Sequence, residues 1–298
     1  MFSAATKSAH TAAGGGATYI EDVFSTYLYT GNGAAGTNIT NGIDLAGKGG
    51  LVWTKPRSVA YNHCLIDTVR GSSVFLSSNK TDPNFSDSSE ITGFLSNGYT
   101  LGDNSGSSLT NTSPYTYASW TFRKQAKFFD VVTWTGDGTV PRTIYHNLQS
   151  VPGFIAVKCT SNGSTNWLCF ARYSDGSSTK LRLNGTAVDY NTVCSQGDIV
   201  GVDYTDRFRV DYGSTGDITG VNQNGYTYVA YLFANNAGGF GASGTDNVIS
   251  CGSFTTNSSW SATVTLGYEP QWIMCKSASA SGQWWMLDNM RSMSLTNS

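Results

Sequence analysis

The sequence predicts an all-β protein built of tandem modules, each a β-sandwich or a β-barrel. Three observations support this fold class: glycine and small polar residues are abundant, aromatic and β-branched residues occur in short runs, and similar runs recur along the chain. The 298 residues include 34 Gly, 16 Tyr, 14 Phe and 8 Trp. Glycine and polar residues favour turns, whereas aromatic and β-branched residues favour strands and supply a core.

Internal repeats divide the chain into three copies of one pattern. Each copy starts with an alternating strand and a glycine or asparagine turn, which is typical of a hairpin. The starts are YLYTGNG at Tyr27, VTWTGDG at Val132 and the weaker GSFTTNS at Gly252. Each copy continues with an apolar strand that ends near a lysine, and a second strand lies about twelve residues beyond it, so we expect antiparallel neighbours. These lysines are Lys55, Lys158 and Lys276.

The first two copies also share a closing strand, YTYASWTFRK from Tyr115 and YTYVAYLFAN from Tyr226. Its apolar residues do not alternate cleanly, which predicts that both of its faces are partly buried. Copy three stops half-way through the pattern, so we expect it to be truncated or completed by another chain. The predicted organisation is a flexible N-terminal attachment arm (1–18), sandwich modules at 19–130 and 131–245, and a partial third module at 246–298.

A charged pair recurs in copies one and three, an Asp followed three residues later by an Arg. Residues three apart on a strand face opposite ways, so each pair can meet only if the chain turns after the Asp. Two hypotheses compete: a carboxylate with a substrate-clamping arginine, or a structural clamp at the end of a strand. The residues are Asp67 and Arg70 in copy one, and Asp288 and Arg291 in copy three.

Copy two decides between these hypotheses. Counted from Lys158, its corresponding positions hold Phe170 and Tyr173 instead of the charged pair. A catalytic pair would not be expected to disappear from the more complete second copy. We therefore predict that all four charged residues are structural clamps and belong to no active site.

The adjacent residues Trp284 and Trp285 are the candidates for a ligand or interface site. A tryptophan within an apolar strand usually belongs to the core. Adjacent residues on a strand face opposite ways, so one of these two indoles faces away from its own core. That ring is expected to meet a ligand, a neighbouring chain or the missing half of the module.

Composition excludes several classes of function. The net charge is −2 without a basic run, which argues against nucleic-acid binding. No stretch of 18 apolar residues is present, so no membrane insertion is expected. The six cysteines form no C-x-x-C pair and the three histidines are scattered, so we expect reduced structural thiols and no zinc site. Asp-containing turns such as TGDG leave calcium open, although ordinary turns explain them.

Catalytic motifs are also missing. We find no G-x-S-x-G elbow, no phosphate-binding loop that ends in G-K-[ST], and no clear carboxylate pair of the kind that glycosidases use. The sequence therefore predicts no catalytic residue, no cofactor and no enzyme activity. Degradation of a polysaccharide is kept as the lesser alternative.

Five motifs follow one another along the chain: YIEDVFSTYLYTGNG, ITNGIDLAGKGGLVWTKPR, NHCLIDTVRG, YASWTFRKQAKFFDVVTWTGDG and RTIYHNLQSVPGFIAVK. In this order they resemble a family of virion structural proteins from marine and cyanobacterial tailed phages. The resemblance covers nearly the whole chain, and its specificity lies in the series of motifs. It implies tandem β-sandwiches similar to concanavalin-like or laminin-G-like jelly rolls, found on the outside of the particle as tail fibres or related appendages.

The resemblance sets the functional expectation. We expect a tail fibre or appendage subunit, assembled in the bacterial host cytoplasm, that contributes to host-surface glycan recognition by multivalent non-covalent binding. Expected partners are other virion proteins, reached through the arm at 1–18, and further copies of the chain, with a trimer favoured by analogy with fibres. The alternatives are an architectural capsid-decoration, neck or baseplate protein without a receptor role and, less favoured, a polysaccharide depolymerase.

Overall fold

The computed structural model describes residues 16–103, 105–107, 109–187, 199–211 and 221–291. Across these residues the chain is nearly all β, with five antiparallel sheets and only short helical turns. The predicted all-β sandwich class is therefore confirmed. Most of the predicted N-terminal arm lies outside the described residues.

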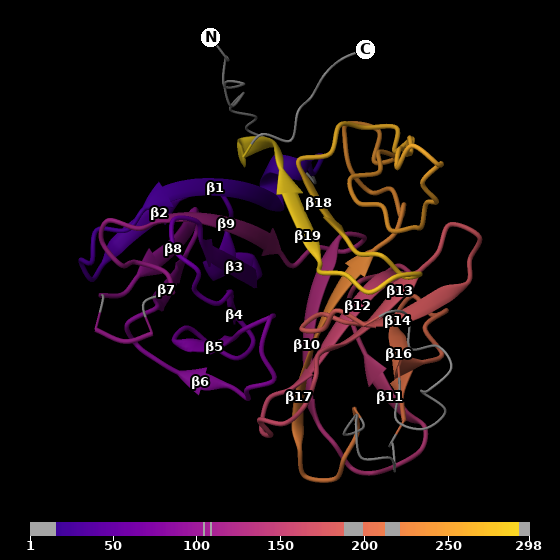
Figure 1. Cartoon of the computed structure of the whole chain (residues 1–298), viewed down its shortest axis with the longest axis horizontal. Helices are drawn as coiled ribbons and strands as arrows, with labels where there is room; N and C mark the ends of the chain where they lie inside the picture. The colour runs from indigo at the N-terminus through magenta and orange to yellow at the C-terminus, as the bar shows by residue number, and fades with distance from the viewer. Residues whose placement is uncertain (1–15, 104, 108, 188–198, 212–220, 292–298) are drawn as a thin grey trace.

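Copy one is a sandwich of a six-stranded and a three-stranded sheet (Figure 1). The large sheet has the order β1-β9-β3-β4-β5-β6 and the small sheet the order β2-β8-β7. A 3-10 turn, η1 (Ile20–Asp22), precedes β1, and a short helix, α1 (Leu45–Lys48), leads into β3. The strands are β1 (Phe24–Thr30), β2 (Thr37–Thr40), β3 (Gly50–Pro56), β4 (Cys64–Asp67), β5 (Val74–Leu76), β6 (Phe85–Ser86), β7 (Ile91–Leu95), β8 (Gly98–Leu101) and β9 (Thr116–Arg123).

Copy two repeats this plan with a five-stranded and a three-stranded sheet. The orders are β10-β17-β12-β13-β14 and β11-β16-β15. Strand β10 starts at Phe129, so it spans the boundary predicted between the first two modules. The strands are β10 (Phe129–Thr135), β11 (Arg142–Tyr145), β12 (Pro152–Cys159), β13 (Leu168–Arg172), β14 (Ser178–Arg182), β15 (Ile199–Val200), β16 (Arg207–Val210) and β17 (Thr227–Ala234).

Copy three contributes a single hairpin to the described structure. It consists of β18 (Trp272–Cys275) and β19 (Trp285–Asp288), and a 3-10 turn, η2 (Asn289–Arg291), follows. The preceding residues 247–271 form no strand. The predicted pairs of neighbouring strands are confirmed in all three copies, as β3 with β4, β12 with β13 and β18 with β19.

Each complete copy has an apolar core between its own two sheets. In copy one this core includes Ile39, Val52 and Ile66. In copy two it includes Ile155 and Phe208. The small sheet of each copy therefore covers the outer face of the large one.

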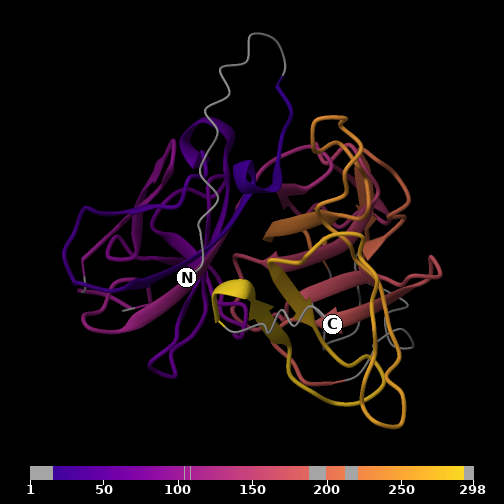
Figure 2. The ribbon, with the colours of Figure 1, turned by 90° about the horizontal axis from the view of Figure 1, so that it is seen from above.

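A third core lies between the large sheets of the two copies. Trp120 from β9 and Phe233 from β17 belong to it, and Met274 and Met286 of the β18–β19 hairpin pack against it. In Figures 1 and 2 the yellow hairpin lies at the junction of the two sandwiches. Strand β9 consequently has cores on both faces, and its six central residues are all buried. This confirms the prediction made from its irregular alternation.

The strand registers show which residues of the three copies correspond. Leu51 of β3 pairs with Asp67, and Trp272 of β18 pairs with Asp288. In copy two Phe154 pairs with Ala171, because the connection between β12 and β13 is one residue longer. The residues that replace the charged pair in copy two are therefore Ala171 and Ser174, and the assignment to Phe170 and Tyr173 was wrong by one position.

Candidate functional site

The charged pair of copy one is a buried tie to copy two. The chain turns after β4, so that Arg70 Nε donates to Asp67 Oδ2 at 2.6 Å. The other carboxylate oxygen, Oδ1, accepts the backbone N–H groups of Val69 and Arg70 at 3.0 and 2.9 Å. Tyr231 of β17 donates its hydroxyl to Asp67 Oδ2 at 2.9 Å, and Arg70 Nη2 donates to the same hydroxyl at 2.9 Å. Burial raises the pKa of Tyr231, which keeps this hydroxyl protonated.

The charged pair of copy three makes the corresponding tie to copy one. Arg291 Nε donates to Asp288 Oδ2 at 2.7 Å, and Trp120 Nε1 donates to the same oxygen at 3.0 Å. The Arg291 guanidinium lies 5.0 Å from the centre of the Trp120 ring. In the closing strands Trp120 stands where copy two has Tyr231. One type of contact is therefore used twice, from copy one to copy two and from copy three to copy one.

A second type of contact between copies is a hydrogen bond from an indole N–H to a backbone carbonyl of the preceding copy. Trp167 of copy two donates its indole N–H to the backbone carbonyl of Ser77 in copy one at 3.0 Å. Trp284 of copy three donates in the same way to Arg182 of copy two at 2.9 Å. The registers place Trp167 and Trp284 at one position, and Ser77 and Arg182 at another.

The repeated lysines of copies two and three also donate hydrogen bonds to the copy before them. Lys158 Nζ of copy two donates to the carbonyl of Thr81 in copy one at 3.0 Å. Lys276 Nζ of copy three donates to the carbonyl of Gly185 in copy two at 3.2 Å. Each of these two copies thus places an indole and an ammonium group on the copy before it. The corresponding residues of copy one are His63 and Lys55.

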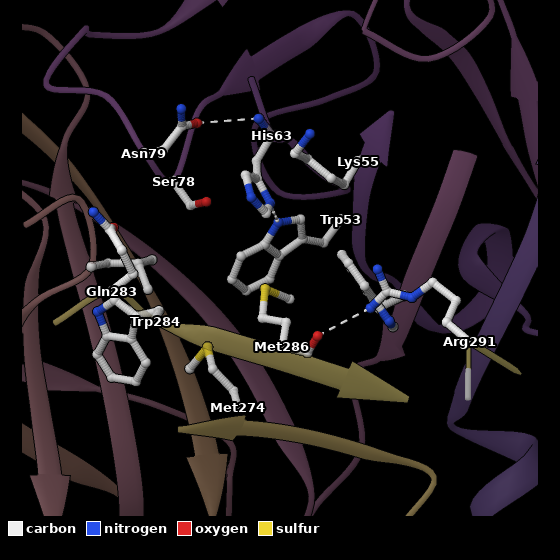
Figure 3. Close-up of a pocket in the computed structure, with 12 residues that line it drawn as sticks. Trp53, Lys55, His63, Ser78, Asn79, Met274, Gln283, Trp284, Met286 and Arg291 are labelled. Carbon is white, nitrogen blue, oxygen red and sulfur yellow. Dashed lines mark hydrogen bonds between the residues drawn. The ribbon is translucent and has the colours of Figure 1, made fainter. Parts of the chain in front are cut away.

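His63 and Lys55 lie at a pocket of about 270 Å³ between copies one and three (Figure 3). Trp53 and His63 stand over the β18–β19 hairpin, which places Met274 and Met286 in the pocket wall. The other lining residues are Lys55, Ser78, Asn79, Trp120, Leu183, Gln283, Trp284 and Arg291. All three copies therefore contribute to this pocket.

The imidazole in the pocket is neutral. Burial lowers the pKa of His63 to about 3, and the nearby charges of Lys55 and Arg291 lower it further in the same sense. Trp53 Nε1 donates to His63 Nδ1 at 2.9 Å, so the proton of the neutral ring is on Nε2. The backbone N–H of His63 is bound to Asn79 Oδ1 at 3.1 Å, which fixes the residue in place.

The two cations of the pocket differ in their pairing. Arg291 forms an ion pair with Asp288 at 2.7 Å. Lys55 Nζ donates to the carbonyl of Pro56 at 2.8 Å and has no carboxylate partner among the described residues. Burial, followed by the charge of Arg291, lowers the pKa of Lys55. The pocket therefore combines indole rings and amides with one ammonium group that can take a further acceptor, such as a carbonyl or an acidic group.

The two candidate tryptophans have different environments. Trp284 lines the pocket and packs against the shared core. Trp285 points away from that core and is 66% exposed. The charged pairs do not converge in one open cleft: the side chains of Asp67 and Arg70 are buried, and of the four residues only Arg291 lines the pocket. Sequence reasoning missed Lys55 and His63, although the recurrence of Lys55 in all three copies was the available signal.

The remaining sequence expectations concern thiols, metals and membranes. Cys64, Cys159 and Cys169 are buried and Cys251 and Cys275 half-buried, all as free thiols, whereas Cys194 lies outside the described residues. Within the described ranges, no group of three or more His, Cys, Asp or Glu residues could hold a metal ion. No helix found there is long and apolar enough to cross a membrane.

These sheets and ties define an all-β protein in which repeated sandwich modules share a common core. The chain belongs to the family described as Domain of unknown function (DUF7483), whose model matches residues 20–298. No curated protein and no solved structure matches the chain.

Proposed function

We propose that this protein is a structural subunit of a phage virion, located on the exterior of the particle as part of a tail fibre or related appendage. The observation that carries the proposal is the way the modules are tied together. Asp67 and Arg70 connect copy one to copy two through Tyr231, and Asp288 and Arg291 connect copy three to copy one through Trp120. Buried ties between repeated modules suit a rigid building block.

The series of motifs that resembles virion proteins of tailed phages supports the location. A low content of charged residues, 13%, and many turn-forming residues between closed sheets suit an exposed particle surface. Attachment would use the N-terminal arm, and the chain would form oligomers, with a trimer favoured by analogy with fibres.

Labelling of particles tests this proposal. An antibody raised against the purified chain should decorate tail fibres or appendages in electron micrographs, and the chain should be detected by mass spectrometry in purified particles. Label over the head or neck would favour the alternative of an architectural protein without receptor contact. Absence of the chain from purified particles would contradict a structural role.

Recognition of host-surface glycan is the second part of the proposal. The pocket between copies one and three favours it, because the Trp284 indole lines it and Lys55 offers an ammonium group without a carboxylate partner in the described structure. An acidic sugar combines an apolar ring face with a carboxylate, which such groups can bind. Each site would be weak, and repeated subunits would add avidity.

A glycan array tests glycan recognition separately from the proposed location on the particle. The purified chain should bind acidic host-envelope glycans, and Lys55→Met should abolish that binding, whereas Lys80→Met, a lysine in an exposed turn, should not. Binding that is indifferent to Lys55→Met would remove the pocket from the proposal. Release of reducing ends from the same glycans would instead favour a depolymerase.

A further inference from the structure

The outer face of the β18–β19 hairpin is apolar, half-buried on β18 and exposed on β19. Its four residues are Ile273, Cys275, Trp285 and Leu287, which alternate with the residues that face the shared core. Trp285 is 66% and Leu287 43% exposed. A contiguous exposed apolar surface of this kind usually marks an interaction site.

The same positions in copies one and two are fully covered. Trp285 corresponds to Cys64 and Leu168, which are 1% and 3% exposed. Leu287 corresponds to Ile66 and Phe170, which are 0% and 2% exposed. In both complete copies, the cover is the three-stranded second sheet, β2-β8-β7 or β11-β16-β15.

The edges of the hairpin are open as well. In copy one, β3 pairs with β9 on its second side, and β4 pairs with β5. In copy two, β12 pairs with β17, and β13 pairs with β14. Among the described residues, β18 and β19 pair only with each other. Two unpaired edges can accept further strands by backbone hydrogen bonding.

The segment before the hairpin also lacks its partners. In copy one the preceding segment forms β1 and β2, which pair with β9 and β8. In copy three the described residues 247–271 form no strand, and Phe254 and Val264 are 57% and 51% exposed. The outer face, the two edges and the preceding segment therefore all lack the same partner among the residues that the structure describes.

We propose that the β18–β19 hairpin docks a polypeptide that completes copy three. The occupant supplies a closing strand along β18, a strand along β19, and a small antiparallel sheet over Trp285 and Leu287.

The ties between copies also specify one residue of this occupant. Asp67 meets Tyr231 and Asp288 meets Trp120, two closing-strand residues that donate a hydrogen bond. The corresponding residue of copy two is Ala171, which has no acceptor in its side chain. The closing strand of the occupant therefore carries an apolar residue without a hydrogen-bond donor at this place. These contacts are internal to the molecule, so the inference does not depend on the proposed virion role, which particle labelling tests separately.

An extended chain tests the proposal. Ser298 follows Asp288 by ten residues, as Ser77 follows Asp67, so residues 78–124 are appended as a second copy directly after Ser298. We expect backbone amides of β18 and β19 to exchange as slowly as those of β3 and β4, measured by hydrogen exchange with mass spectrometry. A matched extension, in which the residues copied from Ala118 and Phe122 are replaced by Asp, should give no protection.

Two further measurements complete the test. Replacing the residue copied from Trp120 by Phe in the appended strand should raise Tm, whereas Trp120→Phe in copy one itself should lower it. Unchanged exchange of β18 and β19 in the extended chain would overturn the proposal. So would a dimer of the original chain, seen by light scattering and abolished by Leu287→Asp, because the face would then belong to a second copy.

Discussion

Copies one and two bury both faces of their central hairpins, whereas copy three buries only one. The outer residues of β3 and β4 lie under a second sheet, whereas the outer residues of β19 are exposed and those of β18 are half-buried. The inner faces of all three hairpins nevertheless pack against the same shared core. The comparison separates two roles of one hairpin: its inner face joins the copies, and its outer face closes its own sandwich.

The largest loss of stability is expected at the contact between copies one and two, where the charged pair is buried. Asp67→Ala would leave Arg70, whose side chain is 5% exposed, as an unpaired buried charge beside the Tyr231 hydroxyl. Breaking a buried ion pair by removing one partner costs about 3–5 kcal/mol. Urea unfolding at pH 7 should show this loss, and Asp175→Ala, in an exposed turn, is the control. Equal stability of Asp67→Ala and the wild type would refute the tie.

A pH-dependent effect is expected at the interface between copies one and three. Burial, Lys55 and Arg291 hold the pKa of His63 at about 3, below its ordinary value of about 6.5. The unfolded chain therefore binds more protons between these values, so stability falls as the pH drops through this window.

The variant His63→Gln removes this titration. Its free energy of unfolding should decline less than that of the wild type between pH 7 and pH 4, by on the order of a few kcal/mol. His146, whose pKa burial also lowers, is present in both proteins and does not affect the difference. Parallel declines in the two proteins would show that His63 is not the titrating group.

A smaller effect is expected from one indole tie. Trp284→Phe keeps most of the ring but removes the N–H bond to the Arg182 carbonyl. Loss of one partner of such a bond costs about 1–3 kcal/mol, and partial exposure places Trp284 at the low end. Thermal unfolding should show a smaller drop in Tm for Trp284→Phe than for Trp167→Phe, because Trp167 is completely buried at the matching hydrogen bond to Ser77. The reverse order would argue against equivalent ties.

The smallest effect is expected on the open face. Leu287→Ala should change the stability of the isolated chain by no more than about 0.5 kcal/mol, as an exposed substitution does. Ile66→Ala, at the matching position of copy one, should cost about 2–5 kcal/mol because it leaves a cavity in a packed core. Denaturant titrations of both variants give the contrast directly, and equal losses would mean that the face of copy three is covered.

The sequence predicted the repeats, the antiparallel hairpins and the buried closing strand, because these depend on short patterns and spacing. It did not predict which strands pack across copies, since contacts such as Trp167 with Ser77 join residues 90 positions apart. Counting from Lys158 also placed Phe170 one position away from the true counterpart, because one extra residue in a connection shifts the register without changing the local pattern. The pocket depends on all three copies at once, which no single motif encodes.

The double attachment of copy three has a consequence for how the molecule comes apart. In a linear array of repeats each unit contacts only its neighbours, and units can unfold one after another from an end. Here the β18–β19 hairpin contacts copy one through Asp288 and copy two through Trp284, so the contacts between the three copies form a ring. Stepwise unfolding is therefore not expected, and denaturation should be one cooperative transition with coincident near-UV and far-UV circular dichroism midpoints.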